Sequence, residues 1–176
     1  MNRWIMIGVL LLLLLFTSLT GYQGRLRSLV QQPVFQKGFS YVAWKHDQFG
    51  SAASDQALRL LQATGTKWVS VVVTWYQRDE HSTIIYRDPE QTPDDEGLLQ
   101  VIKQIHRLGM KVMLRPLIDP ANGAWRGQIS FGQEQDWLAW FRSYRYFIDY
   151  YAELARRAGV EQFCVGVEYA KTLGRG

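Results

Sequence analysis

One pattern of apolar and polar positions occurs three times along the chain. A helical segment ends at a glycine, a short polar step follows, and a nearly continuous apolar run begins. The glycines are Gly65, Gly109 and Gly159, 44 and 50 residues apart, and the apolar runs that follow predict strands over 68–75, 112–118 and 163–167. Short, fully apolar strands alternating with helices are typical of a parallel sheet covered by helices.

The segments between these strands predict amphipathic helices. The first covers 51–63, with Ser51 or Ser54 as its N-cap, and a further strand is predicted before it, over 38–44. The second begins with Thr92 as N-cap and Pro93 at its first position, because proline is favoured there. For the first and second helices, the residues predicted to be buried are Leu58, Leu60, Leu61, Leu98, Leu99, Val101, Ile102, Ile105 and Leu108. The longest helix covers 134–158, with an apolar stripe predicted at Trp137, Phe141, Tyr144, Ile148, Tyr151, Ala155 and Ala158.

The connections are unequal in length, and this asymmetry predicts a fold. The loops after the strands are long, over 76–91 and 119–133, whereas the turns from helix to strand are tight. In (β/α)8 TIM barrels the strand-to-helix loops build the active site. A complete barrel needs about 250 residues, and this chain has 176. We therefore predict an α/β fold with about the first four βα units of a (β/α)8 barrel, over residues 38–176.

The N-terminal residues predict export. Asn2 and Arg3 precede an apolar run over 4–16, which is typical of a secretory signal peptide or of an N-terminal membrane anchor. Residues 1–21 are therefore assigned to a leader that meets the secretion machinery or the membrane, and the polar residues 22–37 to a linker. The barrel is expected outside the cytoplasm, extracellular or anchored.

Charge and motifs exclude several classes of function. The net charge is +4, but residues 1–37 hold four basic residues and no acid, which leaves 16 of each sign in the remainder. A balanced domain of this kind argues against a nucleic-acid partner. The three histidines have no metal-ligand spacing, and no motif predicts a cofactor. The single cysteine, Cys164, excludes an internal disulfide and is predicted to be a buried, inert thiol.

Acidic and basic side chains at the predicted strand ends are candidates for chemistry. Glu168 follows an apolar strand, where partial desolvation would raise its pKa towards that of a general acid. The alternative is an ion pair with a base such as Arg115. Arg115 and Asp119 lie at the end of the strand 112–118, where Pro116 is predicted to end the pairing. Arg115 is a candidate to hold a carboxylate and Asp119 to bind a sugar hydroxyl, unless the two form a structural ion pair.

Aromatic side chains gather at the same strand ends. Five of them are candidates to stack on the apolar faces of pyranose rings, with rim packing as the alternative for each: Trp44, Trp75, Tyr76, Trp125 and Tyr169.

Taken in order, several segments resemble glycoside hydrolase family 113, a family of endo-β-1,4-mannanases. They are Trp75-Tyr76-Gln77, the run 112–119, Trp125-Arg126-Gly127-Gln128-Ile129, the helix 137–151 and Phe163-Cys164-Val165-Gly166-Val167-Glu168. The resemblance implies a barrel of the clan that retains anomeric configuration, with Glu168 as general acid/base at the end of the fourth strand. The chain departs from the pattern at Val167, where the clan usually has Asn, and at Leu117, where a polar residue is common.

The resemblance also implies a second glutamate, the nucleophile, at the end of a seventh strand. We expect that strand to lie beyond the 176 residues, and we expect this chain to show no turnover by itself. The function that follows is retaining hydrolysis of a mannan-like β-linked polysaccharide. Two alternatives stay open at this point: a non-catalytic carbohydrate-binding or cell-envelope domain on the same barrel, and a β-glucanase.

Overall fold

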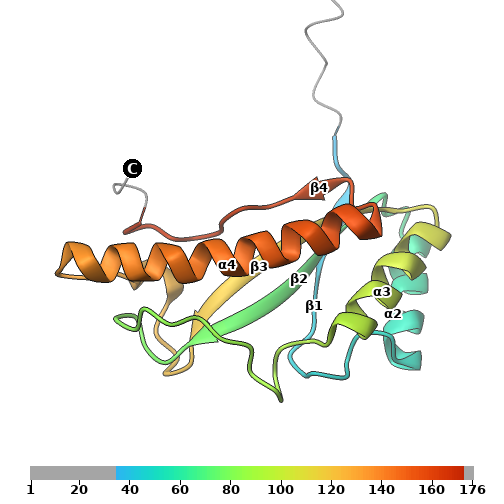
Figure 1. The fold of residues 1–176 in the computed structure, drawn as a ribbon. Helices are drawn as coiled ribbons and strands as arrows, with labels where there is room; N and C mark the ends of the chain where they lie inside the picture. The colour runs from blue at the N-terminus through green and yellow to red at the C-terminus, as the bar shows by residue number, and fades with distance from the viewer. Residues whose placement is uncertain (1–34, 173–176) are drawn as a thin grey trace, which may run out of the picture. The chain divides into compact units, whose positions relative to one another are not determined.

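The structure is a computed structural model that describes residues 35–172. The predicted leader and all but the last residues of the predicted linker lie outside this range. Along the described part the elements are β1 (Gly38–Val42), α2 (Ala52–Ala63), β2 (Trp68–Gln77), α3 (Asp95–Arg107), β3 (Lys111–Pro120), the 3₁₀ turn η1 (Arg126–Gln128), α4 (Glu134–Ala158) and β4 (Gln162–Phe163) (Figure 1). None of the helices between residues 35 and 172 is long and apolar enough to cross a membrane.

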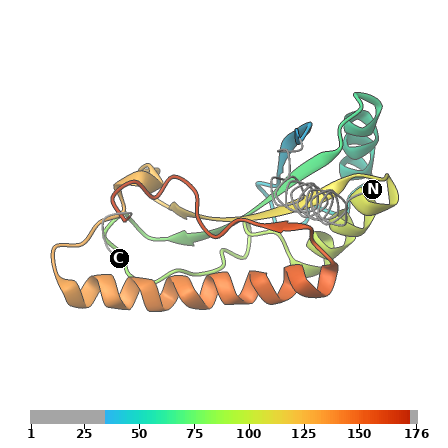
Figure 2. The same cartoon turned by 90° about the horizontal axis from the view of Figure 1, so that it is seen from above.

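The strands of the described residues form one parallel sheet in the order β1-β2-β3-β4. Each strand is connected to the next through a helix, and α4 runs along one face of the sheet (Figure 2). Sequential parallel strands with helical crossovers are the repeating unit of a (β/α)8 barrel. The predicted fold class, a partial barrel with about four βα units, is confirmed.

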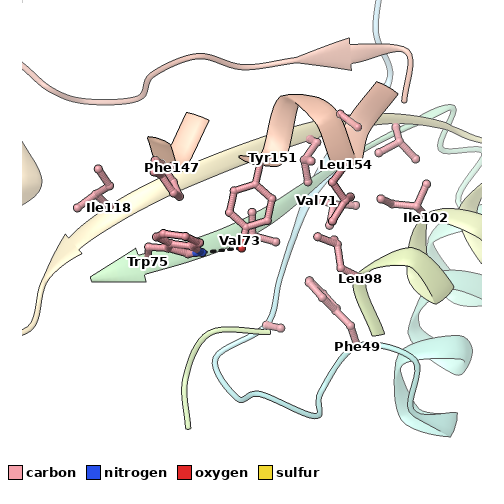
Figure 3. Close-up of a cluster of buried hydrophobic side chains, with 14 of the residues drawn as sticks. Phe49, Val71, Val73, Trp75, Leu98, Ile102, Ile118, Phe147, Tyr151 and Leu154 are labelled. Carbon is pink, nitrogen blue, oxygen red and sulfur yellow. Dashed lines mark hydrogen bonds between the residues drawn. The ribbon is translucent and has the colours of Figure 1, made fainter. Parts of the chain in front are cut away.

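The core lies between the sheet and its helices. Val71, Val73 and Trp75 point from alternate positions of β2 towards α4, where Phe147 and Tyr151 meet them (Figure 3). Alternate residues of a strand share a face, so the intervening positions of β2 face the other side, the interior of the barrel. We call these two sides the helix-covered face and the inward face.

Most helix predictions hold, with corrections in detail. Ser51 caps α2, since its hydroxyl accepts from the Ser54 backbone N–H at 3.1 Å. Two leucines predicted to be buried, Leu60 and Leu99, are exposed. In α4 the buried stripe is Trp137, Trp140, Phe147, Tyr151, Leu154 and Ala155. Only three of the seven predicted positions belong to it, because spacings of three and four residues fit two adjacent stripes of a long helix.

The start of α3 was predicted two residues too early. Its N-cap is Asp94, whose carboxylate accepts from the Gly97 backbone N–H. Thr92 instead connects its loop to β2. Its hydroxyl donates to the Thr74 carbonyl at 2.8 Å and accepts from the Asp88 N–H at 3.0 Å. The three acidic residues in a row explain the error, since any of several positions there offers a capping side chain.

Pro116 does not end the pairing of β3. The strand continues beside β2 to Pro120, paired with Gln77. On its other side β3 pairs with β4 only at Met113 and Leu114. A proline is tolerated in a strand that lacks a strand neighbour on one side, which describes β3 beyond Leu114 within the described residues.

The largest error in the fold prediction is the strand expected over 163–167. β4 ends at Phe163, although the Cys164 N–H still donates to the Leu114 carbonyl at 2.9 Å. The Val165 carbonyl instead accepts from the Tyr144 hydroxyl of α4, and Val165 is exposed. Cys164 is partly exposed, not buried as predicted. The chain therefore leaves the edge of β3 before it reaches Glu168.

Candidate functional site

Four side chains meet at the carboxyl end of β3, and they form a chain of charge-assisted contacts. The Arg126 guanidinium donates to Asp119 through Nε at 2.9 Å, and its Nη2 lies 2.6 Å from the same carboxylate oxygen. Its Nη1 donates to Glu168 at 2.9 Å, and the Trp125 indole N–H donates to that Glu168 oxygen at 3.1 Å. One arginine therefore joins the strand carboxylate Asp119 to Glu168.

The local backbone explains how these groups reach one another. Trp125 and Arg126 belong to the start of η1, the tight turn in the β3–α4 loop. A Cβ at Gly127 would lie 2.5 Å from the Trp125 ring, so a larger residue there would force the ring out of its present place. Glu168 has a φ of +62°, the only positive φ among the non-glycine residues described. A strained, left-handed residue of this kind is uncommon outside special sites.

The electrostatics of Glu168 differ from the prediction. Its pKa is lowered, first by the hydrogen bond from Trp125 and then by the charge of Arg126. The expected upward shift requires burial, but the side chain is 51% exposed. Glu168 is therefore a carboxylate at neutral pH in this arrangement.

Arg115 makes neither of the ion pairs considered for it. Arg126 takes both of its candidate partners, Asp119 and Glu168. Arg115 lies on the inward face of β3, where its Nη2 donates to the Ser40 hydroxyl at 3.2 Å. Its Nε is buried and has no partner among the described residues.

The five candidate aromatic residues divide into two groups. Trp44 and Trp125 are 58% and 54% exposed and are free to stack on a ligand. The other three are buried, which corrects the prediction that they bind sugar. Trp75 belongs to the helix-covered face and donates its indole N–H to the Tyr151 hydroxyl at 2.8 Å. Its parity along β2 places it there, together with the valines of the core.

Tyr76 and Tyr169 are buried for different reasons. Tyr76 forms an antiparallel bridge with Tyr86 of its own loop, and its burial and the nearby Asp119 raise its pKa. Tyr169 packs on Trp140 of α4, and its hydroxyl accepts from the Ile118 N–H at 3.0 Å. Burial raises the pKa of Tyr169 well above its usual range. Its hydroxyl occupies the edge of β3 where a longer β4 would bind.

A hollow of about 680 Å³ adjoins the site. It lies between α4 and residues 165–172, and its lining is mainly apolar, with Trp125 and Glu168 among the contributing residues. Most of its aromatic lining comes from the α4 side, so it continues the helix-covered face more than the inward face. Within residues 35–172, no cluster of three or more His, Cys, Asp or Glu side chains is placed to hold a metal ion.

Comparison with known proteins assigns the family. The sequence profile of Glycoside Hydrolase Family 113 matches residues 38–175. The chain belongs to this family. No curated protein matches the chain significantly.

Solved structures of the family are similar in sequence and in fold. Two solved structures of family 113 β-1,4-mannanase, one of them described as a complex, are each 32% identical over 80% of this chain with a TM-score of 0.74. The β-mannanase AaManA of Alicyclobacillus acidocaldarius, solved in complex with ManMIm, is 30% identical over 78% of this chain with a TM-score of 0.72. The chain spans about half the length of these proteins, 48% and 46% respectively.

Among the residues of this family 113 chain, sequence reasoning missed Arg126. The signal was weak: an arginine next to an aromatic residue in a long strand-to-helix loop. Its partners come from β3 and from the residues after β4, and no local pattern places those segments together. The alternative considered for Glu168 was an ion pair with a base such as Arg115; the structure shows an ion pair, but with Arg126.

Proposed function

We propose that this chain is part of a glycoside hydrolase that cleaves mannan-like β-1,4-linked polysaccharide with retention of configuration, and that Glu168 is its general acid/base. Membership of family 113 supports glycosidase activity, and the similar solved proteins are described as β-1,4-mannanases. The observation that carries the proposal is the meeting of Glu168 with the exposed Trp125 beyond the carboxyl end of β3. The carboxyl ends of barrel strands are where barrel enzymes carry their chemistry.

The mechanism assigns Glu168 two successive proton transfers. In the first step a second carboxylate attacks the anomeric carbon while Glu168 gives its proton to the departing glycosidic oxygen. In the second step Glu168 takes a proton from water, and the water oxygen displaces the enzyme carboxylate from the same carbon. The proton count balances over the two steps, and the glycosidic bond is replaced by two hydroxyl groups.

The second carboxylate must lie about 5–5.5 Å from Glu168 in a retaining enzyme. Asp119 is joined to Glu168 through Arg126, but two guanidinium nitrogens contact its Oδ1, and this ion pair stabilises the carboxylate charge and lowers its nucleophilicity. We therefore assign the nucleophile to a residue outside positions 35–172. Its negative charge next to Glu168 would also raise the Glu168 pKa, because like charges disfavour ionisation. That rise would offset the lowering by Trp125 and Arg126.

The two exposed tryptophans are the proposed sugar platforms. Trp44 follows β1 and Trp125 follows β3, so both project from the strand-end side of the sheet. The flat apolar face of indole suits the C–H face of a pyranose. The leader-like residues 1–21 support export of the enzyme to its polysaccharide.

One observation favours a second candidate, a non-catalytic carbohydrate-binding barrel. Glu168 is held as a carboxylate in an ion pair, which is the state of a structural acid rather than of a proton donor. The two candidates share the exposed tryptophans and differ in whether Glu168 transfers a proton.

Glu168→Gln in the native protein separates the two candidates. Loss of a general acid/base lowers the rate by roughly 10²- to 10⁴-fold, so we expect a loss of this size on mannan. The matched control is Glu153→Gln, an exposed glutamate on α4 that also pairs with an arginine, for which we expect no change. Parallel assays on a mixed β-glucan test the substrate class. A Glu168→Gln protein with the activity of the control would refute the assignment.

A further inference from the structure

The position of Glu168 is not set by the strand that precedes it. β4 ends at Phe163, and the intervening residues make no ladder with β3 beyond the Cys164–Leu114 hydrogen bond. Glu168 itself lies in the left-handed region, at φ +62°. Its carboxylate nevertheless has defined partners, and both belong to a different element, the β3–α4 loop.

We propose that Arg126 is the positioning residue of Glu168, anchored to the sheet by Asp119. Within the ion pair, Arg126 is the more enclosed side chain, since it is only 15% exposed whereas Glu168 is 51% exposed. Asp119 fixes the guanidinium from the end of β3 through contacts at 2.9 and 2.6 Å. The remaining nitrogen of the guanidinium then binds Glu168. This inference rests on the proposed function only for its kinetic consequence, since the geometry stands without it.

Trp125 and Gly127 complete the arrangement. The missing Cβ of Gly127 leaves room for the Trp125 ring against the turn. With the ring in that place, the indole N–H reaches the same Glu168 oxygen as Arg126. A single carboxylate oxygen therefore receives two donors, and the other oxygen is left for a substrate or a proton. Trp125 then has two roles, as donor to the acid and as exposed platform beside it.

Other charged groups near Glu168 are few. From β3, Arg115 adds a weaker favourable charge, and the Asp119 carboxylate is paired with Arg126. From α4, Tyr144 has a pKa raised to about 12, mainly by burial, and stays neutral over the working range. Among the charged groups, Arg126 is thus the one whose removal changes the surroundings of Glu168 most.

The test compares Arg126→Met, Arg126→Lys and Asp119→Asn with Arg156→Met. Arg156 makes two hydrogen bonds of 2.8 Å to Glu153 on the exposed side of α4, so its variant controls for the loss of an ion-paired arginine. The first readout needs no turnover: the Glu168 carboxyl is titrated by ¹³C NMR in this chain, with Glu168→Gln to assign its signal. We expect the pKa of Glu168 to rise in Arg126→Met and to rise less in Arg126→Lys, which keeps a positive charge. In Arg156→Met the pKa of Glu168 should not change.

The second readout is the pH profile of mannan hydrolysis by the native protein. Removal of Arg126 should lower kcat/KM by roughly 10- to 100-fold, as misplaced catalytic groups do. The basic limb, where the acid must be protonated, should move to higher pH, and Asp119→Asn should have a smaller effect of the same kind. The basic limb should stay in place in Arg156→Met.

The acid/base role of Glu168 and the positioning role of Arg126 can be refuted independently. If Glu168→Gln keeps full activity, the proposed function is wrong whatever Arg126 does. If Glu168→Gln is inactive but Arg126→Met matches Arg156→Met in titration and pH profile, Arg126 does not position Glu168. Should Arg126→Met fail to fold by circular dichroism, Arg126→Lys and Asp119→Asn decide the outcome by the same readouts.

Discussion

The two faces of the sheet use polar groups in opposite ways. On the helix-covered face, polar atoms that are buried have partners: the indole N–H of Trp75 binds Tyr151, and that of Trp140 binds the Gln77 side chain. On the inward face, the hydroxyls of Ser70 and Thr74 and the Nε of Arg115 are buried without a partner among the described residues. The helix-covered face is therefore satisfied by this chain's own side chains. The inward face keeps hydrogen-bonding capacity that other groups are needed to satisfy.

The largest expected effect is on the helix-covered face. Phe147 of α4 is fully buried, and its ring lies 5.3 Å from that of Trp75 between centroids. Phe147→Ala should lower the free energy of unfolding by roughly 3–5 kcal/mol, because it removes buried area and leaves a cavity. Urea denaturation of this chain measures the change. Leu138→Ala, at an exposed position of the same helix, is the control and should change stability by less than about 0.5 kcal/mol. Equal effects would show that α4 does not pack as described.

The same substitution at two buried threonines compares satisfied and unsatisfied hydroxyls directly. The Thr92 hydroxyl makes two hydrogen bonds to backbone, whereas that of Thr74 makes none. Thr92→Val should lower the free energy of unfolding by about 1–3 kcal/mol, because it leaves the Asp88 N–H without its acceptor. Thr74→Val should be neutral or stabilising, because it removes an unpaired buried polar group. Chemical denaturation of both variants measures the difference, and a larger loss for Thr74→Val would contradict the statement that the Thr74 hydroxyl is buried without a partner among the described residues.

The smallest expected effect concerns the pH dependence of stability at the opposite end of β3. Burial opposes ionisation of Glu161, but hydrogen bonds from the Val112 N–H and from His106 outweigh it and lower the pKa of the carboxyl below its usual 4.5. A lowered folded-state pKa stabilises the fold above the unfolded pKa, and this contribution is lost as the pH falls through the folded value. Below about pH 4.5, Glu161→Gln should therefore lose less stability than the parent. Thermal unfolding of both proteins at pH 7 and pH 3 measures this. Equal losses of stability in the parent and in Glu161→Gln would show that Glu161 does not contribute to the pH dependence.

The contrast between the faces also explains what the sequence could predict. The helix-covered face is encoded by local patterns, such as valines at alternate positions of β2 and glycine stops at Gly65, Gly109 and Gly159, all three of which have positive φ. The order of strands and helices follows from these patterns. Trp75 alternates with Val71 and Val73 along β2, so the sequence predicts that its side chain lies on the helix-covered face with theirs. Trp75 was predicted to bind sugar because it lies at a strand end, but the alternation of side chains along β2 decides which face it occupies.

The site could be predicted only in part, because its contacts join distant segments. Glu168 and Trp125 were identified from their positions after predicted strands, but their hydrogen bond spans 43 residues. Arg126 contacts one residue that precedes α4 in the sequence, Asp119, and one that follows it, Glu168. That geometry depends on the turn at Gly127 and on the early end of β4. The direction of the Glu168 pKa shift was wrong for the same reason, since burial was inferred from neighbouring apolar residues that the structure leaves partly exposed.

Azide rescue of Glu168→Ala in the native protein tests whether Glu168 is the general acid/base. An aryl β-mannoside with an activated leaving group needs no proton to depart, so the glycosyl-enzyme still forms, and azide attacks it without a general base. If Glu168 is the acid/base, azide will accelerate turnover of the aryl glycoside and give a β-configured glycosyl azide, while mannan stays almost unhydrolysed. No response to azide, with mannan and the aryl glycoside hydrolysed as in the parent, would contradict the assignment of Glu168 as the acid/base.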